Sequence, residues 1–151
     1  MNTLCELLKE NVEIYALFLD LEWEKYNAVI KDDVLTLNDI VSQEEVYYLK
    51  MKGIEQKREK QIELLGLKGK TFKEIIDSSE DKYKTILSEQ FEELNNIVEE
   101  LQKINDLIKT VTEARLRRID KLMADLGEKE ITYSKDKNKS AKEGILISKK
   151  I

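Results

Sequence analysis

The sequence KYKTILSEQFEELNNIVEELQKINDLIKTV, residues 82–111, decides the fold of this chain. One stripe of its apolar side chains recurs at intervals of three, four or seven residues, and consists of Tyr83, Leu87, Leu94, Ile97, Leu101, Ile104, Ile108 and Val111. This spacing is typical of a coiled-coil seam, in which one face of a long helix packs against neighbouring helices. We expect the helix to begin at Ser78 or Ser79, either of which can cap its first turn, and to end at Leu126 before Gly127.

The apolar pattern changes phase late in this predicted helix. In the phase of the seam, Arg115 and Arg118 would point inward. The apolar residues instead fall one position later, at Leu116, Ile119, Met123 and Leu126. Such a shift is typical of a stutter, where a coiled-coil seam locally unwinds. The late part of the helix therefore presents a new apolar face.

Two more long helices are predicted before this one. Apolar residues recur with helical spacing up to Val29, and again from about Val34 to Leu65. The pattern pauses at Lys31–Asp33, where Asp32 is a candidate N-cap for the second helix. The sequence leaves open whether this pause is a turn or a kink.

A turn and a short helix are expected between the second and third long helices. Gly66 and Gly69 indicate the turn. Thr71 and Glu74 have the spacing of a capping box, which predicts a helix over Thr71–Ile76. The predicted fold class is therefore all-α: an elongated antiparallel bundle or coiled coil of three long helices, with residues 1–127 as the helical domain.

Residues 128–151 are expected to form a flexible basic tail. This stretch has seven Lys and four Asp or Glu, so it carries +3, whereas the body before it carries −8. Its few apolar residues include Ile131, Tyr133, Ile145, Leu146 and Ile147. A segment too polar to fold alone but with apolar anchors is typical of a chain that folds on a partner. A solvated tail without function is the alternative.

The composition argues against an enzyme. The 151 residues carry a net charge of −5 and include no His, no Pro and one Cys. Without His there is no Ser-His-Asp triad, no Cys-His pair and no His-based metal site. Adjacent carboxylates such as Glu44–Glu45 point about 100° apart on a helix, which favours a solvated face over an acid-base site. We expect no catalytic activity, no cofactor and no metal.

The charge and hydropathy patterns also bear on location. The acidic balance disfavours a nucleic-acid partner, whose binding surface would be basic. The start of the chain has no basic leader followed by an apolar run, and no apolar stretch approaches the roughly 20 residues needed to cross a bilayer. We expect a cytoplasmic protein without membrane insertion.

One stretch carries a resemblance to a known family. The sequence KYNAVIKDDVLTLNDIVSQEE, residues 25–45, resembles the FlgN-like flagellar export chaperones. Ile54–Arg58, Leu101–Ile108 and Tyr133 follow in the order of that family, so the resemblance covers about residues 4–137. Asp32 stands where the family often has Asn, and Lys139–Ile151 has no counterpart.

The resemblance implies a cytoplasmic chaperone of the flagellar type III export system. Such a protein binds the hook-filament junction (hook-associated) proteins, prevents their premature assembly and delivers them to the membrane export gate. It implies that Tyr133 docks at the export gate. The expected client-binding residues are Leu116, Ile119, Met123, Leu126, Ile131, Ile145, Leu146 and Ile147. The expected state is a monomer or weak homodimer.

Two other functions stay open from the sequence. One is a structural coiled-coil protein that associates with itself through the third long helix. The other is a secretion chaperone for a different client, such as flagellin or the filament cap protein.

Overall fold

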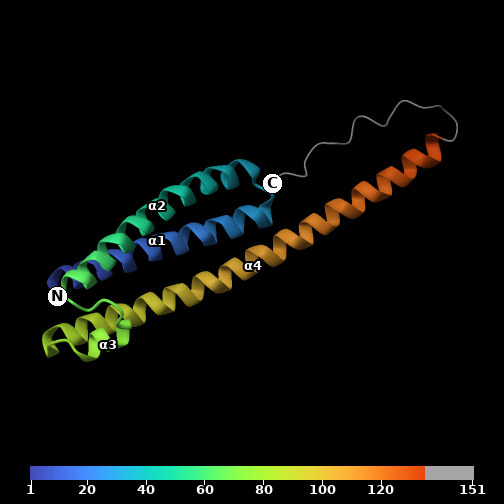
Figure 1. Cartoon of the computed structure of the whole chain (residues 1–151). Helices are drawn as coiled ribbons and strands as arrows, with labels where there is room; N and C mark the ends of the chain where they lie inside the picture. The colour runs from blue at the N-terminus through green and yellow to red at the C-terminus, as the bar shows by residue number, and fades with distance from the viewer. Residues whose placement is uncertain (135–151) are drawn as a thin grey trace. The chain divides into compact units, whose positions relative to one another are not determined.

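The computed structural model describes residues 1–134, of which residues 129–134 are described by their backbone alone. Four helices follow one another along the chain: α1 (Asn2–Lys31), α2 (Val34–Leu64), α3 (Phe72–Asp77) and α4 (Asp81–Ser134) (Figure 1). No β-strand occurs in residues 1–134. The predicted all-α fold with three long helices is therefore confirmed.

The pause between the first two helices is a turn. Asp32 adopts the left-handed conformation, with φ 56°, and ends α1. The next residue, Asp33, is the N-cap of α2: its carboxylate accepts the backbone N–H of Thr36 at 3.1 Å and the Thr36 hydroxyl at 2.7 Å. The prediction of Asp32 as the N-cap was wrong by one residue, because the residue in the left-handed position cannot also begin the next helix.

The connection from α2 to α4 begins with the turn that was predicted at Gly66 and Gly69. Gly66 and Gly69 both have positive φ, 70° and 84°, a conformation that Gly adopts at little cost. The capping box of α3 is confirmed, since Thr71 accepts the Glu74 N–H at 3.3 Å and Glu74 accepts the Thr71 N–H at 2.7 Å.

The predicted start of the last long helix was wrong. Ser78 is the C-cap of α3, and the Ser79 hydroxyl donates to the Ile75 carbonyl at 2.6 Å. The two serines therefore complete the end of the short helix, and α4 begins later, at Asp81. A serine hydroxyl can accept from a backbone N–H at the start of a helix or donate to a carbonyl at the end of one, and the sequence does not show which of the two occurs here.

Two apolar clusters hold the helices together. The first joins the start of α1 to α3 and α4, and consists of Leu4, Cys5, Leu8, Ile75, Ile76 and Leu87. The second joins the rest of α1 to α2 and α4, and consists of Phe18, Leu21, Ala28, Ile40, Leu101, Ile104 and Ile108. Burying a large aliphatic side chain contributes about 1.5–3 kcal/mol. The predicted seam of residues 82–111 is confirmed, since its members are buried or half-buried.

The predicted end of the last helix was also wrong. Gly127 lies inside α4, which continues to Ser134. A single Gly costs a helix about 1 kcal/mol relative to Ala, and the following Glu128–Glu130 are good helix formers. By compactness the chain divides into Met1–Val111 and a second unit from Thr112. The flexible tail falls mostly on residues 135–151, outside the described residues, and stays a prediction.

Candidate functional site

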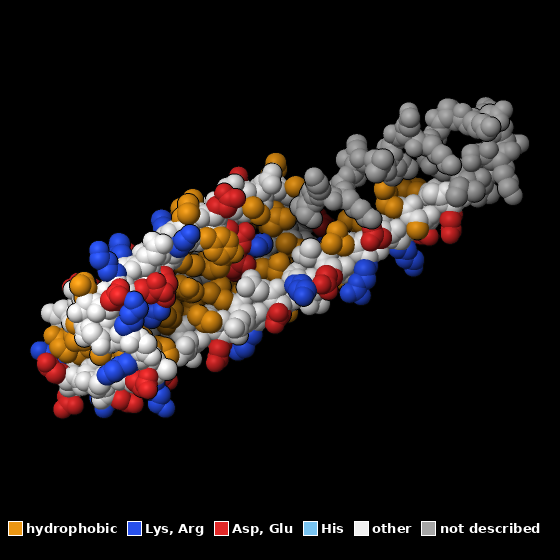
Figure 2. Space-filling view, in the orientation of Figure 1, with side chains coloured by type: hydrophobic (Ala, Val, Ile, Leu, Met, Phe, Trp, Pro, Cys, Tyr) orange, Lys and Arg blue, Asp and Glu red, His pale blue; other side chains and the backbone are white. Residues whose placement is uncertain are grey.

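The second unit begins where the buried seam of α4 ends. Ile108 is buried, Val111 and Arg115 are half-buried, and the following apolar side chains are at least half exposed. They are Leu116, Ile119, Leu122, Met123 and Leu126, with exposed fractions between 50% and 57%. We call these five residues the α4 apolar face. Orange side chains mark this part of α4 in Figure 2.

The α4 apolar face is one continuous stripe. Ile119 lies three residues after Leu116, the adjacent Leu122 and Met123 lie three and four after Ile119, and Leu126 lies four and three after them, which places all five on the same side of a helix. The predicted change of phase after Val111 therefore has a structural meaning, because it marks the boundary between covered and uncovered apolar residues. An uncovered stripe of this kind is typical of a surface that binds another protein.

The charged residues beside this stripe form local pairs. Arg117 lies 3.8 Å from Glu113, one turn away, and the two side chains are 80% and 49% exposed. An exposed pair of this kind adds little stability.

The structure brings together four of the eight expected client-binding residues, namely Leu116, Ile119, Met123 and Leu126. It adds Leu122, which the sequence interpretation missed although it lies three residues after Ile119 and four before Leu126. The backbones of Ile131 and Tyr133 belong to the last turns of α4. Ile145, Leu146 and Ile147 lie outside the described residues.

A second feature is a buried polar cluster between α1 and α2. The Lys25 ammonium donates to Glu44 Oε1 at 2.6 Å and lies 3.7 Å from Glu22 Oε2. Glu22 is 1% exposed and Glu44 is 7% exposed. Among the described residues, neither carboxylate oxygen of Glu22 has a hydrogen-bond partner. The expectation that Glu44 belongs to a solvated face was therefore wrong.

The pKa values of this cluster follow from its burial. Burial raises the pKa of Glu22 to about 7, and the neighbouring Glu44 carboxyl adds to the shift. Burial opposes the charge on Lys25, yet the hydrogen bond to Glu44 and the two carboxylates raise its pKa. The pKa of Tyr48 is raised as well, first by burial and then by Glu44 and Glu22.

A signal for this cluster was present in the sequence. Glu22 falls in the apolar stripe of α1, four residues after Phe18 and four before Tyr26. Glu44 likewise falls in an apolar stripe, that of α2, because it lies four residues after Ile40. A charged residue in the phase of an apolar stripe indicates burial with a partner. The cluster contains one ammonium for two carboxylates and no nucleophile.

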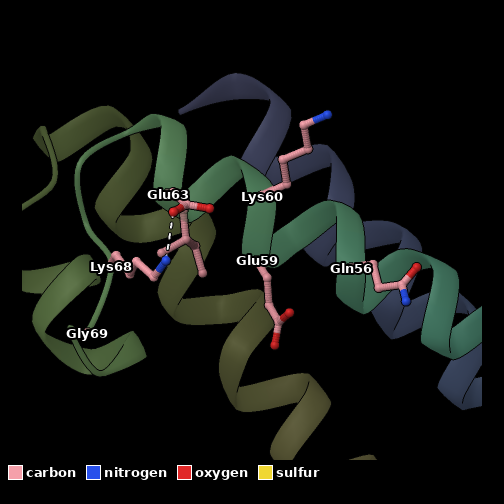
Figure 3. Close-up of a pocket in the computed structure, with 7 residues that line it drawn as sticks. Gln56, Glu59, Lys60, Glu63, Lys68 and Gly69 are labelled. Atoms are coloured by element: carbon pink, nitrogen blue, oxygen red, sulfur yellow. Dashed lines mark hydrogen bonds and ion pairs between the residues drawn. The ribbon is translucent and has the colours of Figure 1, made fainter.

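A shallow hollow lies at the end of α2, with a volume of about 520 Å³ (Figure 3). It is lined by Gln56, Glu59, Lys60, Ile62, Glu63, Lys68 and Gly69. Across it Lys68 donates to Glu63 at 2.7 Å, with both side chains mostly exposed. Five of its seven lining residues have charged or amide side chains that are exposed to solvent, unlike the mostly apolar, enclosed pockets that bind small molecules.

The described residues contain neither a cluster of metal ligands nor a membrane-spanning helix. Among residues 1–128, whose side chains the structure describes, no three metal-ligating side chains lie together. None of the helices described here is long and apolar enough to cross a membrane. The feature best suited to a function is thus the α4 apolar face.

The fold and this face define the class: an all-helical bundle protein with an uncovered apolar face on its longest helix. The chain matches the family described as FlgN protein over residues 1–141, and it belongs to this family. FlgN proteins are flagellar export chaperones that bind flagellar proteins, and they are not a family of enzymes. No curated protein and no solved structure matches the chain.

Proposed function

We propose that this chain is a cytoplasmic chaperone that binds hook-associated flagellar proteins, prevents their premature assembly and delivers them to the export gate. The observation that supports this most is the α4 apolar face, whose five large side chains are uncovered in a protein of the FlgN family. An amphipathic helix of this kind binds a partner by burying its apolar stripe.

The proposed mechanism is that the chaperone sequesters its client by mass action. A client segment that pairs with the α4 apolar face is withdrawn from assembly for as long as it stays bound. Ile131, Ile145, Leu146 and Ile147 would extend the contact along the chain. Because a segment that orders on binding loses conformational entropy, its affinity stays modest and release at the gate stays easy.

The direct test is co-purification of the full chain with candidate clients. We expect hook-associated proteins to bind, whereas flagellin and the filament cap protein should not. Binding of flagellin or the cap protein alone would contradict the client assignment while keeping the chaperone class. A tight oligomer of the chain that binds none of these clients, detected by light scattering, would favour the structural coiled-coil alternative.

A truncation tests the role of the chain after Gly127. Removing residues 128–151 leaves the five residues of the α4 apolar face in place, so we expect weakened binding of hook-associated proteins. Full affinity in the truncated chain would remove Ile131 and Ile145–Ile147 from the client surface.

Tyr133 is proposed to dock at the export gate. Tyr133→Ala should leave the affinity for hook-associated proteins unchanged and reduce their export, since docking and client binding would use different residues. Client affinity is measured with purified proteins and export by the amount of client secreted. Unchanged secretion would remove this role from Tyr133.

A further inference from the structure

The α4 apolar face lies open within the described residues, and the second unit of the chain contains a candidate to cover it. Its five side chains are 50–57% exposed along about 15 Å of helix, from Leu116 to Leu126. Soluble monomeric proteins rarely leave large apolar patches exposed. A segment that covers this face before a client arrives would remove its apolar side chains from water.

The sequence after α4 contains one short apolar segment. Residues 145–151 read ILISKKI and begin with three adjacent aliphatic residues; we call them the ILISKKI segment. Residues 135–144, KDKNKSAKEG, join this segment to α4 and contain no apolar side chain larger than that of Ala. Such a composition is typical of a linker. The family match ends at residue 141, so the ILISKKI segment lies outside it.

The length of the linker suits the second half of the α4 apolar face. Leu126 and Leu122 precede Ser134, the end of α4, by about 12 Å and about 18 Å along the helix. A flexible chain of ten residues has a root-mean-square end-to-end distance of about 17 Å and reaches at most about 33 Å. When a linker matches the span in this way, the tethered segment has a millimolar effective concentration. The linker therefore favours the same chain over a second copy, which lacks the tether.

The charges favour the same half of the face. Residues 112–119 carry +2, from three Arg and one Glu, whereas residues 120–128 carry −2, from three acidic residues and one Lys. The ILISKKI segment carries +2, from its two Lys. Asp120 and Asp125 are exposed, and no ion pair within the described residues involves them. A basic segment is therefore attracted to residues 120–128 and repelled from residues 112–119.

We propose that, in the chain without a client, the ILISKKI segment lies on the second half of the α4 apolar face of the same chain. Its three adjacent aliphatic side chains cover those of Leu122, Met123 and Leu126. Its two lysines lie beside Asp120 and Asp125. A client that takes this face displaces the segment, which is then free to make the client contact proposed above. Because the covering contact forms in the chain alone, it does not depend on the proposed function.

A spin label on the ILISKKI segment tests this contact in the free chain. Cys5→Ala removes the native thiol, and Ser148→Cys then carries a nitroxide at residue 148 alone. The nitroxide should broaden the methyl NMR signals of Leu122, Met123 and Leu126.

Two pairs of substitutions in the spin-labelled chain separate a contact from mere proximity. Ile145→Asp/Ile147→Asp should remove most of the broadening, because it places two charges in an apolar contact. The matched control, Asn138→Asp/Ser140→Asp, adds the same two charges to the linker and should leave the broadening in place.

A mixed sample separates this arrangement from a contact between copies. Isotope-labelled chains without a nitroxide are mixed with unlabelled chains that carry one, and the same methyl signals should stay sharp. Broadening in the mixed sample would place the segment on a second copy and overturn the proposal. Broadening that persists in Ile145→Asp/Ile147→Asp, or no broadening in the spin-labelled full chain, would overturn it as well. No client is present in these samples, so their outcomes are distinct from a failure of the proposed function.

Discussion

Glu22 is the residue whose environment departs most from an ordinary helical core. Its carboxylate is buried among the apolar side chains of α1, beside a second carboxylate. The Lys25 ammonium lies near both carboxylates, but its contact with Glu44, at 2.6 Å, is shorter than its contact with Glu22, at 3.7 Å. Burying a charge without hydrogen bonds is costly, so Glu22 reduces the stability of the fold at neutral and higher pH.

Removing this charge should stabilise the protein. We expect Glu22→Gln to raise the free energy of unfolding at about pH 8 by about 1–3 kcal/mol, since a neutral amide is less costly to bury than a carboxylate. Urea denaturation followed by circular dichroism measures the change. The matched control is Glu24→Gln on the exposed side of the same helix, which should have little effect. A loss of stability in Glu22→Gln would show that the ion pair with Lys25 outweighs the burial cost.

The same residue predicts a pH dependence. The pKa of Glu22 is about 7 in the folded chain and 4.5 as the ordinary value, so the folded state holds the proton more tightly. The resulting stabilisation is complete below the lower pKa and is lost as the pH rises through about 7. The free energy of unfolding should therefore fall by up to roughly 3 kcal/mol between about pH 5 and about pH 8.

Urea denaturation across this pH range measures the effect, and Glu22→Gln is the control because it lacks the titrating group. Its stability should depend less steeply on pH than that of the unchanged chain. Equal slopes in the two proteins would assign the pH dependence to other residues.

At the scale of the elements, helix interiors and one capped helix start were predictable, whereas the ends predicted at Asp32, Ser78 or Ser79, and Gly127 were wrong. The capping box of Thr71 and Glu74 could be predicted because both hydrogen bonds are local. Asp32 and Asp33 are equivalent in the sequence, and which one takes the left-handed position depends on how α1 turns into α2. Gly127 indicated a helix end because Gly often occupies the position after a helix, yet the residues beyond it continue α4.

Gly127 offers a test of the course of α4. Its φ is not in the positive range, and an added Cβ would meet no atom within 4 Å. Gly127→Ala should therefore stabilise the helix locally by about 0.5–1 kcal/mol. Hydrogen exchange of the amides around residue 127 should become slower in Gly127→Ala. Faster exchange of these amides would mean that the helix ends at this residue.

The same substitution at Gly66 is the matched contrast. Gly66 has φ 70°, so an Ala there is strained and Gly66→Ala should lower the free energy of unfolding.

At the scale of the whole molecule, the sequence predicted what depends on spacing along one helix. The seam of α4 and the change of phase after Val111 are periodic features, so four residues of the α4 apolar face could be named in advance. For the Glu22–Lys25–Glu44 cluster, the sequence indicates the burial of the two glutamates by their place in apolar stripes, but the contact of Lys25 with Glu44 depends on how α1 packs against α2. The exposure of Leu35 and Leu49 on α2 could not be predicted for a related reason: it depends on which side of α2 packs inward.

The central claim is that the α4 apolar face binds hook-associated proteins, and one pair of variants tests it most directly. Met123→Asp places a charge in the face, whereas Lys121→Asp places the same charge about half a turn away on the same helix. We measure the affinity of each purified variant for hook-associated proteins by calorimetry. Met123→Asp should weaken binding by about tenfold or more, and Lys121→Asp should leave it nearly unchanged. Equal affinities of Met123→Asp and the unchanged chain would contradict the claim.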